Sequence, residues 1–350
     1  MRFSTKAVNF AIAMAVGLGG GSAVAEDWYP YTVDVWPRLE MRTPRTHLAY
    51  VPLFKAEKKW DLCATLPHFN GEFWHAIDYG MVDEARRLGV SLRISLAGGY
   101  EGLVLQARQM RDCVASGADA VIVAGVSYDQ LDDVVKEIVE GGTPVINVAN
   151  DMLAETLTAK SSVSFGERGW YLAEYLVKKH PEGGEVAMVG WLPEGGMAGW
   201  VFTQHFEDEA KHGAVEMVLN EDEDGGDPVE WLLGAAPDIK YIAADPVNAM
   251  AATDSLFNAA KETEVMVLSY DLTDQVYEGI RNGTILAAIT DSSVIQGRIA
   301  IDQAVRILEG KPYKLHVGPV HFIVDRSNIS HIDRDAMLAP KGFEPVLNVD

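Results

Sequence analysis

Basic residues, cysteines and long apolar segments are all scarce in this sequence of 350 residues. The 29 Lys and Arg residues against 51 Asp and Glu residues give a formal net charge of −22. Such a surface repels phosphate backbones, so we expect no nucleic-acid partner, and it also helps to keep an exported protein in solution. No run of 18 uncharged apolar residues follows the N-terminal segment, which excludes a polytopic membrane protein.

The motifs of common catalytic and cofactor sites are also missing. The sequence contains no G-x-S-x-G, H-E-x-x-H, C-x-x-C or P-loop pattern. His316, His321 and His331 show no i,i+4 ligand pairing, and the acidic run at 221–227 lacks the spacing and terminal Glu of an EF-hand. We therefore expect no enzymatic activity, no cofactor and no bound metal.

The first 25 residues have the pattern of a secretory signal peptide. Arg2 and Lys6 precede an apolar stretch at 7–19, and small residues at 23–25 form a cleavage site after Ala25. A membrane anchor is the alternative, but the apolar stretch is too short for one. We expect export to the periplasm and no lipid anchor, because the residue directly after Ala25 is not a Cys.

Residues 26–58 are rich in aromatics and prolines, and we expect an extended arm that packs on its own lobe or contributes to docking on a partner. From Lys59 onwards, short apolar runs alternate with amphipathic helical segments, and most turns contain glycine. The alternation restarts after Ser161. This pattern predicts an α/β fold with two doubly wound parallel-sheet lobes.

Aromatic and acidic residues recur where the predicted strands end. Ligands of doubly wound sheets bind at the carboxyl ends of the strands, so we expect a site between the two lobes. Aromatic faces hold quaternary ammonium groups, and carboxylates fix hydroxyls or a cation. For any single aromatic residue, packing in the core is the alternative. The candidate ligand-binding residues are Phe73, Trp74, Tyr100, Tyr128, Phe165, Asp245, Tyr270, Asp271 and Asp291.

The two cysteines fall on neighbouring predicted elements. Cys63 lies on the first strand of the alternating region, and Cys113 lies on the helix after the second strand. In the usual 2-1-3 strand order this helix crosses over the first strand, so a disulfide can form in an exported protein. Two buried free thiols are the alternative.

Two long stretches resemble type I periplasmic binding proteins, the ribose-binding superfamily. They are QVYEGIRNGTILAAITDSSVIQGRIAIDQAVRILEGKP at 275–312 and FWHAIDYGMVDEARRLGV at 73–90, and the resemblance covers about 59–325. It implies two lobes joined by a three-segment hinge. The implied N-terminal lobe comprises residues 59–160 with 290–315, and the C-terminal lobe comprises 161–289 with 316–350.

Within this superfamily, the stretches at 59–81, 96–123, 269–280 and 341–345 resemble members that bind trimethylamine N-oxide and present it to a membrane sensor histidine kinase. The aromatic cage of those members carries over to Trp74 and Tyr100. Phe165 stands where a Trp is expected, and Asp271 stands where a Tyr is expected. A carboxylate at Asp271 favours a trimethylammonium group and repels an N-oxide oxygen.

The resemblance implies a protein that binds trimethylamine N-oxide or a similar methylamine or quaternary amine between its lobes. Its expected partner is the periplasmic domain of a sensor histidine kinase in a two-component system. The alternative is a substrate-binding protein of an ABC importer for a sugar or polyol, which Asp271 and Asp291 favour. A monomer is usual for the superfamily.

Overall fold

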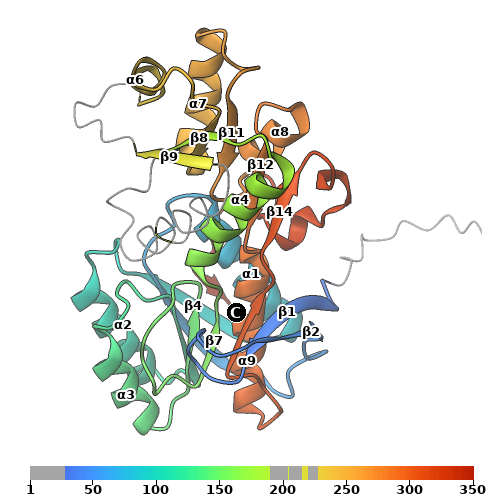
Figure 1. The fold of residues 1–350 in the computed structure, drawn as a ribbon. Coiled ribbons are helices and arrows are strands. Elements are labelled where there is room, and N and C mark those ends of the chain that lie inside the picture. The colour runs from blue at the N-terminus through green and yellow to red at the C-terminus, as the bar shows by residue number, and fades with distance from the viewer. Residues whose placement is uncertain (1–27, 190–203, 205–214, 220–227) are drawn as a thin grey trace, which may run out of the picture.

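The computed structural model describes residues 28–189, 204, 215–219 and 228–350. The predicted signal peptide, the helix expected at 197–212 and the acidic turn at 220–227 lie outside these residues, apart from Gln204. The described chain forms two lobes, one above the other in Figure 1. Within these ranges, no helix combines the length and apolar character needed to cross a bilayer.

The N-terminal lobe is built on a nine-stranded sheet with the order β15-β4-β3-β5-β6-β7-β13-β1-β2. Its six inner strands, from β4 to β13, are parallel, and antiparallel strands close both edges. The strand bounds are β1 (Tyr31–Trp36), β2 (Thr46–Tyr50), β3 (Asp61–Leu66), β4 (Ser91–Leu96), β5 (Ala120–Val123), β6 (Val145–Val148), β7 (Ala159–Ser161), β13 (His316–Pro319) and β15 (Asn348–Val349).

Helices cover both faces of this sheet: α1 (Glu72–Leu88) and α9 (Ser293–Leu308) on one, α2 (Leu103–Ala115) and α3 (Asp132–Glu140) on the other. Successive residues of β3 point to opposite faces, so Leu62 joins the core under α1 and Cys63 joins the core under α2. Gly80 and Gly297 face each other's helices, and the backbones approach so closely that neither position has room for a Cβ.

The C-terminal lobe has a six-stranded sheet with the order β14-β12-β11-β10-β8-β9, parallel except for β14. Helix α4 (Phe165–Lys179) packs on one face, and α6 (Pro228–Ala235), α7 (Pro246–Asn258) and α8 (Asp274–Asn282) pack on the other. The remaining elements are β8 (Gly184–Val189), β9 (Val215–Leu219), β10 (Tyr241–Ala244), β11 (Met266–Ser269), β12 (Ala287–Thr290), β14 (Phe322–Asp325) and the short 3₁₀ helices η1 (Ile329–His331) and η2 (Arg334–Ala336). The predicted α/β fold of two doubly wound lobes is therefore confirmed.

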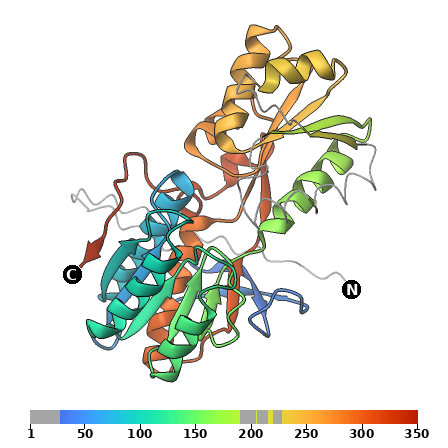
Figure 2. The same cartoon turned by 90° about the vertical axis from the view of Figure 1, so that its left-hand side faces the viewer.

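Among the described residues, the chain passes between the lobes four times. The last passage runs from β14, through η1 and η2, to β15. The other three run from β7 to α4, from β12 to α9, and from β13 to β14. Figure 2 shows these three crossings beside the lower end of α4. Residues 315–324, whose apolar pattern predicts a single crossing strand, form two strands in two sheets. Pro319, which has no amide hydrogen to donate, is the last residue of β13, and β14 begins after two further residues.

The predicted lobe boundaries need correction at four places. Ser161 lies in the N-terminal sheet and Thr290 in the C-terminal sheet, each one residue beyond the predicted boundary, and two longer segments are misplaced. Residues 316–319 and 348–349 belong to the N-terminal sheet, not to the C-terminal lobe. The reason is edge pairing, because β15 adds to β4 and buries Val349 against the core of the N-terminal lobe. Figure 2 accordingly shows the C-terminus on that lobe.

The arm at 26–58 contributes regular structure to the N-terminal lobe. β1 pairs with β13, and β2 pairs with β1, so the arm extends the sheet by a hairpin. The Trp28 indole donates a hydrogen bond to the buried Glu84 carboxylate at 3.0 Å, and the Tyr50 hydroxyl donates one to Asp302 of α9. Packing against its own lobe, one of the two expectations, is what the structure shows.

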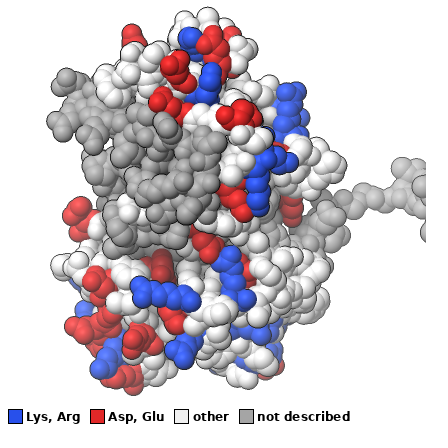
Figure 3. Space-filling model, viewed as in Figure 1, with Lys and Arg blue, Asp and Glu red and all other residues white. Residues whose placement is uncertain are grey.

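Charges of both signs are mixed on the surface. On the face drawn in Figure 3, Lys and Arg lie among Asp and Glu on both lobes. Oppositely charged surface residues also form ion pairs. The Arg111–Glu137 pair, 2.7 Å apart between α2 and α3, is an example.

Candidate functional site

The candidate site lies where elements of both lobes meet. Phe73 and Trp74 are in the first turn of α1, directly after the loop that follows β3. Phe165 is the first residue of α4, beyond the first crossing. Asp271 follows β11, and Asp291 follows β12. Because the parallel strands of each sheet end at the same edge, these side chains converge on the lobe boundary.

Aromatic rings form a continuous row across this boundary. From Tyr100 to His68 the ring centroids are 5.5 Å apart, and from His68 to Trp74 they are 5.7 Å apart. Phe73 follows at 5.1 Å from Trp74, and Phe165 of the other lobe lies 6.2 Å from Phe73. The row leads from Tyr100, which is 53% exposed, to the partly buried Phe165, whose ring lies beside the buried Arg168.

At Phe165 the row meets a cluster of three charged groups. Arg168, one turn into α4, forms ion pairs with Asp291 and, at 3.6 Å, with Asp271. Its guanidinium carbon lies 4.5 Å from the centroid of the Phe165 ring and 5.8 Å from that of Phe73. The cation thus bridges two carboxylates of one lobe and an aromatic ring of the other.

The two carboxyl groups differ in protonation. Burial raises the pKa of Asp271 to about 7, and the neighbouring Asp291 adds to the rise, while Arg168 opposes it. Burial acts against ionisation of Asp291 too, but Arg168, His321 and Ser293 together hold the pKa of Asp291 below its ordinary value. Asp291 therefore stays ionised as the partner of Arg168. Asp271 exchanges a proton near neutral pH, and its side chain is 13% exposed.

A direct hydrogen bond joins the lobes beside the cluster. The Asp274 backbone amide, at the start of α8, donates to Oε2 of Glu72 at the start of α1, at 2.7 Å. Together with the Phe73–Phe165 and Phe73–Arg168 contacts, this bond shows that the two lobes touch at the site.

Three other predicted residues have no contact with the aromatic row or the Arg168 cluster among the contacts described above. The Tyr270 ring is fully buried in the core of the C-terminal lobe, with its hydroxyl bonded to the Ala243 carbonyl. Asp245 caps α7, accepting from the Val247 and Asn248 amides at 3.0 and 3.1 Å. Tyr128 is on the loop after β5 and is 39% exposed.

Two residues of the site escaped the sequence analysis. Arg168 carried a readable signal, because it stands three residues after Phe165 on the same helix and therefore on the same side. His68 carried a weaker one, its position just after the Asp61–Leu66 strand. Trp191, another aromatic at a predicted strand end, lies outside the described residues.

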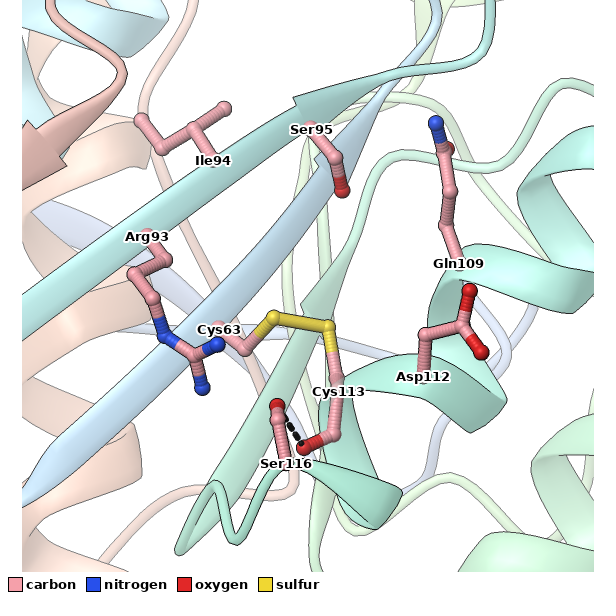
Figure 4. Close-up of a pocket in the computed structure, with 8 residues that line it drawn as sticks. All are labelled: Cys63, Arg93, Ile94, Ser95, Gln109, Asp112, Cys113 and Ser116. Atoms are coloured by element: carbon pink, nitrogen blue, oxygen red, sulfur yellow. Dashed lines mark hydrogen bonds between the residues drawn. A yellow bond between two sulfur atoms is a disulfide. The ribbon is translucent and has the colours of Figure 1, made fainter.

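The disulfide joins Cys63 to Cys113 with their Cα atoms 5.7 Å apart. It forms one wall of an open pocket of about 320 Å³ between β4 and α2, drawn in Figure 4. None of its lining residues belongs to the aromatic row: they are Cys63, Arg93, Ile94, Ser95, Gln109, Asp112, Cys113 and Ser116. Among the described residues, no group of three or more His, Cys, Asp or Glu side chains is arranged to hold a metal ion.

Comparison with known proteins identifies the class to which this fold and site belong. The model of the periplasmic binding protein domain family matches residues 64–312. The chain therefore belongs to the periplasmic binding protein family.

Within that family, the chain is similar to the periplasmic protein TorT of Escherichia coli (strain K12). The two are 30% identical over 306 residues, which is 85% of this chain and 87% of TorT. A crystal structure of the complex of the TorS sensor domain with TorT in the presence of TMAO matches with a TM-score of 0.71 and 27% identity. It covers 83% of this chain and 100% of that chain.

A further solved relative is an ABC transporter solute binding protein from Bradyrhizobium sp. BTAi1 with bound bis-tris. Its TM-score is 0.85, its identity is 41%, and the match covers 92% of this chain and 99% of that chain. The relatives named here are binding proteins, and this chain has their fold.

Proposed function

We propose that this protein is exported to the periplasm, binds a small amine-bearing solute between its lobes and presents it to the sensor domain of a membrane histidine kinase. The solute class is a methylamine such as trimethylamine N-oxide or a quaternary amine. The observation that carries the proposal is the row of aromatic rings that ends at Arg168, Asp271 and Asp291.

The chemistry of the row suits a methylated nitrogen. Methyl groups pack against ring faces, and a positive charge gains from the rings' negative faces. Asp271 then selects by its proton. When ionised it pairs with an ammonium group, and when protonated it donates a hydrogen bond to an N-oxide oxygen. A pKa of about 7 leaves both forms populated at neutral pH.

The relatives support an amine ligand from two directions. TorT is solved with TorS in the presence of TMAO, and the Bradyrhizobium protein holds bis-tris, a tertiary amine that carries five hydroxyl groups. Both molecules carry a nitrogen with three carbon substituents, together with one or more oxygen atoms. The proposed site offers aromatic rings for the substituted nitrogen, and it offers Arg168 with two carboxyl groups for the oxygen atoms.

Calorimetry of the protein lacking residues 1–25 tests the ligand class, with trimethylamine N-oxide, choline, glycine betaine, bis-tris and ribose as titrants. Saturable binding of at least one of the amines, reduced at least tenfold in a Trp74→Ala variant, supports the proposal. Binding of ribose alone would overturn it.

A second candidate is the substrate-binding protein of an ABC importer for a sugar or polyol. Arg168 between Asp271 and Asp291 favours it, because alternating donors and acceptors in a buried cluster suit hydroxyl groups. Neighbouring genes separate the two candidates. A histidine kinase beside this gene supports sensing, whereas a permease and an ATPase support import.

A further inference from the structure

The hairpin of β1, β2 and their connecting loop (residues 31–50) reaches from the N-terminal lobe to the C-terminal lobe. Arg45, just before β2, donates from Nη1 to Oε1 of Glu167 at 2.5 Å and from Nη2 to the Tyr171 hydroxyl at 3.4 Å. Glu167 and Tyr171 both lie on α4. Their spacing of four residues puts them on one side of that helix, so Arg45 contacts a single helix face.

Arg45 is itself held firmly within the hairpin. Its Nε lies 3.0 Å from Oδ2 of Asp34, a β1 residue that is only 2% exposed, and His47 lies 2.6 Å from the other Asp34 oxygen. The Arg45 guanidinium carbon is also 5.7 Å from the centroid of the Trp36 ring. β1 is in turn paired with β13, so the N-terminal sheet supports the contact of Arg45 with α4.

Helix α4, which Arg45 contacts, also contains Phe165 and Arg168 of the candidate site. Arg168 is the immediate neighbour of Glu167, and on a helix of 3.6 residues per turn the two side chains point about 100° apart. The first turn of α4 is thus held from two directions. Arg45 holds Glu167 outside the site, while Asp291 and Phe73 contact Arg168 within it.

We propose that Arg45 is a positioning residue for ligand binding: its contact with Glu167 fixes α4 across the lobe boundary and thereby places Arg168 against Phe73. This inference rests on the proposed binding site between the lobes. It predicts that cutting the contact loosens the start of α4 and weakens ligand binding, although neither Arg45 nor Glu167 touches the Arg168 cluster.

Glu167→Gln is the appropriate variant, because it removes the charge from the cross-lobe contact and leaves the Arg45–Asp34 pair intact. Tyr171→Phe removes the second contact with α4. Glu137→Gln is the matched control, since it weakens the Arg111–Glu137 pair, which lies wholly within the N-terminal lobe. The probes are choline, trimethylamine N-oxide and bis-tris, titrated by calorimetry. Amide hydrogen exchange across α4 is measured without ligand.

We expect Glu167→Gln to weaken binding by about fivefold or more, a typical coupling between linked sites. We also expect it to speed exchange in α4, while Glu137→Gln leaves both unchanged. Equal dissociation constants in the wild type and Glu167→Gln would overturn the inference. If the wild type binds none of the probes, the proposed function fails, and exchange in α4 alone decides: faster exchange in Glu167→Gln supports the role of Arg45 in fixing α4, and unchanged exchange overturns it.

Discussion

At the scale of single residues, the proton on Asp271 sets the charge that a ligand would meet in the proposed binding site. Arg168 and Asp291 neutralise each other, so the charge of the cluster depends on the remaining carboxyl group. Its pKa of about 7 means that the cluster is neutral in mild acid and negative in mild base. We therefore expect the proposed site to favour ligands of different charge at different pH.

Two ligands of different charge should respond in opposite ways. Choline carries a fixed positive charge, so its affinity should rise by about tenfold from pH 6 to pH 8 as Asp271 ionises. Trimethylamine N-oxide presents an oxygen, so its affinity should fall over the same range. Titration calorimetry at pH 6, 7 and 8 measures both trends.

Asp271→Asn should flatten both pH profiles, because the amide cannot ionise. Asp254→Asn, at an exposed position on α7 of the same lobe, should leave them unchanged. Parallel pH profiles for the two ligands would contradict this account of Asp271.

Asp78, on α1, is a second buried carboxyl group and is outside the candidate site. It accepts a hydrogen bond from the Val346 amide at 2.8 Å and so ties the C-terminal segment to α1. Burial raises its pKa from 3.8 to about 7, although the Val346 bond and Arg86 oppose the rise. Because the folded-state pKa is raised, the stability from Asp78 is present below pH 4 and is lost as pH rises through 7.

We expect Asp78 to cost the wild type about 4 kcal/mol of unfolding free energy between those two limits. Asp78→Asn should remove most of this dependence of the unfolding free energy on pH and should stabilise the protein at pH 8. Urea unfolding at pH 5, 6, 7 and 8 checks it, with Asp112→Asn, an exposed position on α2, as the control. If the unfolding free energy of Asp78→Asn still falls with pH as in the wild type, other groups cause the pH dependence.

Sequence position predicted which residues reach the lobe boundary but not which way they point. Tyr270 and Asp271 are consecutive at a strand end, and neighbours along a strand face opposite ways, so one of the pair enters the core. Asp245 carries the same pattern as Asp271 but serves as a helix cap. Arg168 was missed because its partners lie more than 100 residues away in the sequence.

At the scale of elements, the contact between α1 and α9 is the closest helix packing of the N-terminal lobe. A Cβ at Gly297 would meet the Ile77 carbonyl, and one at Gly80 would meet the Val294 carbonyl. These atoms belong to backbone and cannot move aside as a flexible side chain would. The two helices also begin next to the site: α1 begins at Glu72, directly before Phe73, and α9 begins at Ser293, two residues after Asp291.

Gly297→Ala should therefore destabilise the protein by about 2–4 kcal/mol, in the range of overpacked cores. Gly234→Ala is the matched control, since its Cβ would meet nothing within 4 Å on the exposed side of α6. That change should be neutral or stabilise by up to about 1 kcal/mol. Thermal unfolding of both variants measures the difference, and equal effects would contradict the close approach.

The alternation of strands and helices was predictable because each element buries its own pattern of apolar residues. The β-hairpin of the arm was harder to predict from the sequence. Its strands gain their partner from β13, far along the chain, and local spacing does not reveal that pairing. The division of 315–324 into β13 and β14 likewise depends on two different sheets.

At the scale of the whole molecule, export is the property that the N-terminal sequence predicts. The chain produced in a Gram-negative host should be recovered from the periplasmic fraction with Glu26 as its first residue. N-terminal sequencing and intact mass check this, and replacing Ala25 with a bulky residue such as Tyr should block the cleavage. Recovery of a periplasmic chain that starts at Met1 would contradict it.

The N-terminal sheet takes β2 at one edge from near the start of the chain and β15 at the other edge from its last residues. In the export that we propose, the start of the chain passes through the membrane channel first and β15 emerges last. The lobe therefore cannot seal both edges of its sheet until residue 349 has emerged. Until then β4 lacks its outer neighbour and the Asp78 carboxyl lacks its tie to Val346. We therefore expect the N-terminal lobe to complete its fold only after the end of the chain has crossed the membrane.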